Sequence, residues 1–127
     1  MAMRWFTRAK PKEIWEEPVA WPIGDIEAAH RIRDICRAAA DGAEKAGEAR
    51  GGDSQQADVQ RYERAARAAM EIAMKIADDL LRDSAVRQII GLCVKADDLR
   101  TARILVRAIQ APSIREEVMR DYPQLES

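Results

Sequence analysis

The chain has 127 residues, which fits a single domain with a core of its own. Its 21 Lys and Arg residues are balanced by 22 Asp and Glu residues, and this near-neutral charge argues against a globally basic nucleic-acid-binding protein. The sequence contains no run of about 18 apolar residues, and no apolar stretch follows its basic start. We therefore expect a cytoplasmic protein with neither a signal peptide nor a membrane span.

Small side chains dominate the apolar part of the sequence. It has 23 Ala residues, against 25 Leu, Ile, Val and Phe residues together. Each methyl group contributes little transfer free energy, so alanine-rich helices must approach one another closely or bury further area against another chain. This composition favours a homo-oligomer or a subunit of a larger assembly.

Residues 1–23 differ in composition from the rest of the chain. They hold all three Trp residues, the only Phe and three of the five Pro residues, and this mixture cannot sustain a long helix. We predict an extended N-terminal arm that either folds back on its own domain or docks on another chain. Large aromatic side chains dominate interface energetics, so the candidate partner-binding residues are Trp5, Phe6, Trp15 and Trp21.

Residues 24–127 have the pattern of a single α-helical domain. Asp25 is placed as the N-cap of a first long helix, which the glycine pair of the stretch ARGGD ends. Asp53 or Ser54 then caps a second helix, whose apolar stripe continues to Leu80 at spacings of three and four. Their similar lengths predict a long antiparallel helical hairpin.

Three shorter helices are expected after this hairpin. One begins after Ser84, and the next is capped by Asp97 or Asp98 and ends before the proline of the stretch PSIRE. Ser113 and Glu116 have the spacing of a capping box, which predicts a fifth helix. No segment alternates as a strand does, so the predicted class is all-α, either a helical bundle or a short solenoid-like stack.

A similar pattern occurs twice at an interval of 33 residues. The stretches are AMEIAMKIADDLLRD and ARILVRAIQAPSIRE, and the identical pairs are Ala69 and Ala102, Ile76 and Ile109, and Arg82 and Arg115. With Pro112 in the turn, residues 69–122 resemble bacterial tetratricopeptide-like helical-hairpin repeats. The resemblance implies stacked helix pairs that bind peptides or partner proteins. The alternative is two independent amphipathic helices of similar composition.

Arginine recurs at helical spacing in two places. One stripe is Arg61, Arg64 and Arg67, and the other is Arg100, Arg103 and Arg107. If the two stripes were adjacent they could contact a nucleic-acid backbone, because the arginine side chain binds phosphate with two parallel hydrogen bonds. A solvated helix face is the competing interpretation.

The remaining candidate chemistry is a Glu-x-x-His pattern formed by Glu27 and His30, the only histidine. This spacing occurs in helical di-iron sites, but one copy supplies too few ligands unless a dimer doubles it. Cys36 and Cys93 have no zinc-binding spacing, and no nucleophile or phosphate-loop motif is present. We expect no metal and no cofactor.

Together these patterns predict a non-enzymatic protein-interaction or oligomerisation module. The first alternative is a helical subunit that contacts nucleic acid through the arginine stripes. The second is a dimeric metal-carboxylate enzyme built on Glu27 and His30.

Overall fold

The structure is a computed structural model and describes residues 12–48 and 53–126. Within these ranges the chain forms helices and no strand, which confirms the all-α prediction. The elements in chain order are η1 (Ile14–Glu16), α2 (Asp25–Gly47), α3 (Asp53–Ala73), α4 (Asp79–Lys95), α5 (Leu99–Ala108), α6 (Pro112–Asp121) and η2 (Pro123–Leu125).

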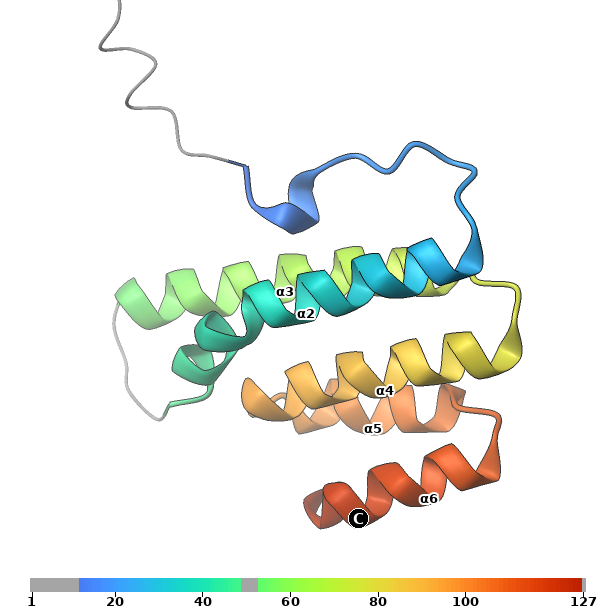
Figure 1. Cartoon of the computed structure of the whole chain (residues 1–127). Helices are drawn as coiled ribbons and strands as arrows, with labels where there is room; N and C mark the ends of the chain where they lie inside the picture. The colour runs from blue at the N-terminus through green and yellow to red at the C-terminus, as the bar shows by residue number, and fades with distance from the viewer. Residues whose placement is uncertain (1–11, 49–52, 127) are drawn as a thin grey trace, which may run out of the picture.

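The helices are arranged in successive layers (Figure 1). The long hairpin of α2 and α3 forms the first layer, the pair of α4 and α5 the second, and α6 the third. Helices α2, α4 and α6 run in one direction, and α3 and α5 run in the opposite direction. Helix α2 packs against both α3 and α4, and α4 packs in turn against α5 and α6. The first helix of each layer therefore stacks on the first helix of the next.

Alanine allows the first two helices to pack closely, as the composition suggested. The buried face of α2 has the three- and four-residue spacing of one helix side and consists of Ala28, Ile32, Ile35, Ala39, Ala43 and Ala46. At the end of the same helix, a Cβ atom on Gly47 would lie 2.5 Å from the carbonyl oxygen of Lys95. Only glycine lets α2 meet the end of α4 this closely.

The first helix begins differently from the prediction. Gly24 is its N-cap, and Asp25 is the first helical residue, so the prediction of an Asp25 cap is wrong. The Asp25 carboxylate instead accepts hydrogen bonds from the backbone N–H groups of Ala77 and Asp78, at 3.1 and 2.9 Å. It thereby holds the turn between α3 and α4 against the start of α2.

The boundary between the second and third helices also differs. Helix α3 ends at Ala73 rather than continuing to Leu80, and α4 begins at Asp79 rather than after Ser84. Asp78 is the N-cap of α4, because its side chain accepts a hydrogen bond from the N–H of Leu81 at 2.9 Å. Apolar residues keep their three- and four-residue spacing across the turn between α3 and α4, so this spacing did not reveal where α3 ends.

Of the last two helices, α5 has the N-cap that was predicted and α6 has a different one. Asp98 is the N-cap of α5 and accepts a hydrogen bond from the N–H of Thr101 at 3.2 Å. Helix α6 begins at Pro112 with Ala111 as its N-cap and no side-chain cap, so the predicted capping box of Ser113 and Glu116 is wrong. Proline is favoured at the first helical position, where no N–H is needed.

Candidate binding site

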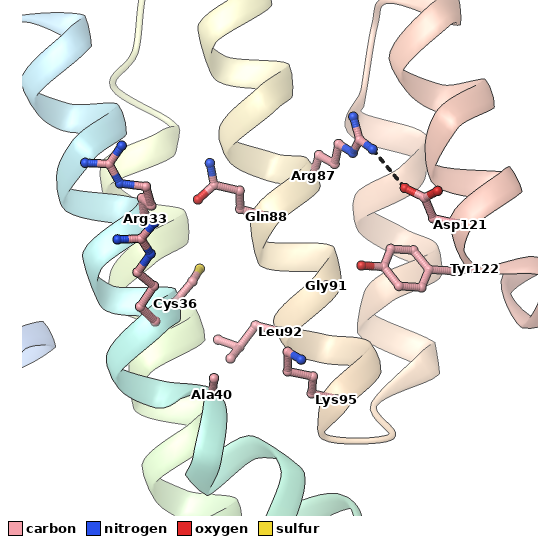
Figure 2. A pocket seen from close by; sticks show the side chains of 11 residues that line it. Arg33, Cys36, Ala40, Arg87, Gln88, Gly91, Leu92, Lys95, Asp121 and Tyr122 are labelled. Atoms are coloured by element: carbon pink, nitrogen blue, oxygen red, sulfur yellow. Dashed lines mark hydrogen bonds and ion pairs between the residues drawn. The ribbon is translucent and has the colours of Figure 1, made fainter.

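A groove of about 390 Å³ opens between α2, α4 and the end of α6 (Figure 2). We call it the stack groove, because each of its walls is the first helix of a layer. Leu92 and Ala40 supply apolar surface to it, and Gln88 and Tyr122 supply polar groups. Four basic side chains also line it, against a single acidic one, Asp121; the four are Arg33, Arg37, Arg87 and Lys95.

Two of the four basic residues are engaged by carboxylates. The Arg87 guanidinium donates to Glu117 at 2.6 Å and to Asp121 at 2.8 Å, and this pair of bonds ties α4 to α6. Lys95 lies 3.6 Å from a carboxylate oxygen of Glu44, and both side chains are well exposed. Exposed ion pairs of this kind are weak, so the Lys95 ammonium remains accessible to another anion.

The two basic residues on α2 are much less neutralised. Arg33 Nε lies 3.9 Å from a carboxylate oxygen of Asp34, which is too long for a hydrogen bond. This Nε atom is buried and has no hydrogen-bond partner. Among the residues that the structure describes, no carboxylate forms an ion pair with Arg37. The α2 wall therefore carries two guanidinium groups with unused hydrogen-bonding capacity.

The far wall of the groove is shaped by a contact between two helices. The Tyr122 ring points toward α4 at Gly91 (Figure 2). A Cβ atom on Gly91 would lie 3.0 Å from the Tyr122 hydroxyl oxygen, which is closer than side chains normally approach. Gly91 thus admits the tyrosine that closes this side of the groove.

Neither cysteine is prepared for nucleophilic chemistry. Burial, together with the neighbouring Cys93, raises the pKa of the Cys36 thiol to about 12. Burial also raises the pKa of Cys93 to about 11, although a hydrogen bond with Tyr62 opposes the shift. Because the thiolate is the reactive form, both side chains are protonated and inert at neutral pH.

The described part of the arm folds back over α2 and α3 (Figure 1). Trp15 in η1 is only 7% exposed and belongs to the core, whereas Trp21 is 37% exposed and lies 4.7 Å from the Lys75 ammonium. Glu13 anchors the segment through a 2.9 Å ion pair with Arg61. The other two predicted partner-binding residues, Trp5 and Phe6, lie outside the described residues.

Two of the six stripe arginines have structural partners within the chain. The Arg61 guanidinium pairs with Glu13 and lies 5.5 Å from the Trp15 ring, and Arg103 donates to the carbonyl oxygens of Gln124 and Leu125. The four exposed ones are divided between α3 and α5, and they are Arg64, Arg67, Arg100 and Arg107.

A second cavity, of about 320 Å³, lies between α3 and α5 with Arg67 on its edge. At this cavity the Tyr62 hydroxyl donates to a carboxylate oxygen of Asp98 at 2.7 Å. Burial is the main cause that raises the pKa of Tyr62, and Cys93 and Asp98 raise it further. The hydroxyl is therefore a fixed structural donor.

The predicted metal pair lies on an exposed part of α2. Both Glu27 and His30 are solvent-exposed. Over residues 12–48 and 53–126, no group of three or more His, Cys, Asp or Glu side chains is placed to hold a metal ion. The single-chain structure therefore gives Glu27 and His30 no third ligand within these ranges.

The stack groove was not predicted from the sequence. Its one local signal is the four-residue spacing of Arg33 and Arg37, which places two like charges on one helix face. The other wall comes from residues at least 50 positions later, and no sequence pattern connected the two segments.

Comparisons with known proteins leave the site to be interpreted from its own geometry. No protein-family model, no curated protein and no solved structure matches the chain. In the ranges that the structure describes, no helix combines the length and apolar character needed to cross a membrane.

Proposed function

We propose that the chain is a non-enzymatic interaction module that holds a segment of a partner protein in the stack groove. The observation that carries this proposal is the groove itself, in which three helices from successive layers line one open cavity of about 390 Å³. Its apolar surface and basic rim resemble the composition of protein interfaces, where arginine is enriched. Cavities of this size also accommodate a few side chains of a bound segment.

A repeat relationship between layers would explain why such a groove forms, and two hydrogen-bonding patterns support it. The Arg82 guanidinium donates to the Ile76 carbonyl oxygen at 3.2 Å, and Arg115 donates to the Ile109 carbonyl oxygen at 3.1 Å. Each member of the second pair lies 33 residues after its counterpart in the first. The same side chain thus closes the same kind of turn after α3 and after α5.

The second pattern involves a carboxylate from the first helix of each layer. Asp25 in α2 accepts from the two N–H groups that follow Ile76, and Asp83 in α4 accepts from the two that follow Ile109. Asp25 and Asp83 thus accept hydrogen bonds at corresponding turns, after α3 and after α5. This correspondence favours the interpretation of the layers as tetratricopeptide-like helix pairs, which stack in this way.

Site-specific photo-crosslinking tests the proposed function. A photo-reactive amino acid replaces Gln88, which lines the groove, and in a matched variant it replaces Gln60, an exposed glutamine on α3 that lines no cavity described above. In cells that produce the protein naturally, we expect a discrete protein adduct from position 88 and none from position 60. Equal labelling at both positions, or none at position 88, would contradict the proposal.

Self-association is a second candidate, because exposed apolar side chains surround the turn between α3 and α4. Ile26, Met74 and Leu80 are 64%, 71% and 62% exposed, and Asp25 binds this turn directly. The ammonium of Lys75, within this turn, lies over the ring of the neighbouring Trp21. Such clusters of exposed apolar side chains are typical of contacts between proteins.

Light scattering after size-exclusion chromatography tests self-association. We expect a mass above that of one 14.3 kDa chain, which Leu80→Glu reduces to the monomer. The matched control is Ile104→Glu, at a 53% exposed position on α5, and it should leave the mass unchanged. A monomeric unsubstituted chain would contradict this candidate.

The exposed arginines of α3 and α5 leave nucleic-acid binding as a prediction to be tested separately. Binding of single-stranded RNA that weakens steeply with salt, and is lost in Arg100→Glu/Arg107→Glu, would support it. Absence of such binding would remove it.

A further inference from the structure

The two guanidinium groups on the α2 wall of the stack groove form no hydrogen-bonded ion pair among the residues that the structure describes. Arg33 and Arg37 are one turn apart on α2, and like charges at this spacing repel each other. The Asp34 carboxylate lies 3.9 Å from Arg33 Nε and makes no hydrogen bond with it. An anion placed between the two guanidinium groups would relieve this repulsion.

A buried donor atom on the same wall is also unsatisfied. Arg33 Nε is screened from solvent and has no partner, although buried polar groups are nearly always hydrogen-bonded. Gln88 lies across the groove from Arg33 (Figure 2), and its side-chain amide makes no hydrogen bond within the described parts of the chain. The groove thus offers donors from two helices to one acceptor group.

The carboxylates around the groove disfavour a long polyanion as its occupant. Asp34, Glu44, Glu117 and Asp121 lie at or next to the basic residues. A nucleic-acid backbone brings a phosphate at every nucleotide and would meet these carboxylates on both sides of the basic wall. A short segment of polypeptide can place one or two acidic side chains between them.

From these observations, and resting on the proposed function, we propose that the partner segment is an acidic peptide. One of its Asp or Glu carboxylates bridges Arg33 and Arg37, and a neighbouring apolar side chain packs on Leu92 and Ala40. Arginine suits this role, because its planar guanidinium binds a carboxylate through two parallel hydrogen bonds. Basic residues flanking the acidic position would face Glu44 and Glu117.

The test uses the full chain and a short fluorescein-labelled peptide in which one glutamate stands next to a leucine and lysines flank the pair. Its matched peptide has glutamine at the glutamate position. Fluorescence anisotropy at low salt should show binding of the glutamate peptide, with Kd raised at least about tenfold by Arg33→Gln/Arg37→Gln. Arg100→Gln/Arg107→Gln removes the same charge from exposed positions on α5 and should change Kd by less than about twofold. Circular dichroism confirms that both variants are folded.

Several outcomes would overturn the acidic-peptide inference. The first is that the glutamate peptide does not bind at a concentration of about 1 mM. The second is that the glutamine peptide binds with equal affinity, and the third is that the two arginine double variants lose equal affinity for the glutamate peptide. Displacement of the peptide by inorganic phosphate at a similar concentration would reduce the groove to a simple anion site. Tighter binding of single-stranded RNA, lost in the Arg33→Gln/Arg37→Gln variant, would assign the groove to nucleic acid instead.

The two proposals can fail separately. If position 88 crosslinks to a protein but the Arg33→Gln/Arg37→Gln variant captures it equally well, the interaction module stands and the acidic-peptide inference is wrong. If position 88 captures nothing, the proposed function itself fails.

Discussion

Asp83 is a buried carboxylate that supports a turn far from it in the sequence. It is 1% exposed, and its oxygens accept from the N–H groups of Gln110 and Ala111 at 3.2 and 2.8 Å. A buried charge of this kind is tolerated because its hydrogen bonds replace those of water. Asp83 therefore links the start of α4 to the turn that leads into α6.

Replacing Asp83 with Ala should destabilise the fold strongly. Hydrogen bonds to a charged group contribute about 1.5–3 kcal/mol each, and the loss leaves two backbone donors without an acceptor. We expect urea denaturation to show a free energy of unfolding lower by about 2–4 kcal/mol. The corresponding Asp25→Ala change at a more exposed carboxylate should cost less, and equal losses would argue against this account.

The two thiols give the fold a defined response to alkaline pH. In the folded chain the pKa values of Cys36 and Cys93 are about 12 and about 11, against 9.0 for an ordinary thiol. Because the folded values are raised, the stabilisation is fully present below pH 9 and is lost as the pH rises toward 11 to 12. Above pH 9, the unfolding free energy of the unsubstituted chain should fall more steeply than that of Cys36→Ala/Cys93→Ala. Parallel pH profiles would contradict the assignment.

Among the elements, α4 shows why the apolar pattern located the helices better than their ends. Ile76 and Leu80 continued the spacing of α3, yet Ile76 is buried in a turn and Leu80 is exposed at the start of α4. The chain turns between them where Asp25 and Asp78 supply acceptors. Asp25 is more than 50 residues earlier, so no local pattern could reveal its role. The all-α class and the long hairpin depended on local spacing and were predictable.

The α4–α6 contact can be measured through Gly91 and Tyr122. Gly91→Ala gains about 1 kcal/mol of helix propensity but brings a Cβ atom to 3.0 Å from the Tyr122 hydroxyl. We expect the gain to appear in a Tyr122→Ala background and to be offset when the tyrosine is present. A double-mutant cycle by urea denaturation checks this, and additive effects would mean that the two residues do not interact.

At the scale of the whole molecule, the arm supplies a large side chain that the alanine-rich layer lacks. Trp15 is buried against α2 and α3, and a Glu13–Arg61 ion pair and an Arg31 hydrogen bond to the Glu17 carbonyl oxygen hold the segment. The arm was predicted only as an alternative between self-packing and docking, because aromatic content alone does not say which surface receives it. For residues 12–23 the surface is the chain's own first layer.

The two described tryptophans should therefore contribute unequally to stability. Trp15→Ala removes a core side chain and should lower the free energy of unfolding by about 3–5 kcal/mol. Trp21→Ala removes a half-exposed ring with a cation–π contact and should cost about 0.5–1 kcal/mol. Thermal or urea unfolding measures both changes, and similar costs would show that the arm is not part of the core.

The contacts at the two ends of α2 have a consequence for the kinetics of binding. Asp25 fixes the start of α2 to the turn before α4, and the backbone contact of Gly47 with Lys95 fixes its end. With both ends held, the spacing between the α2 and α4 walls is fixed within the free chain, so the proposed partner would meet a formed groove. Such preorganisation lowers the entropic cost of association, because the walls need not search for their arrangement. Encounter and orientation, rather than opening of the stack, should then set the association rate.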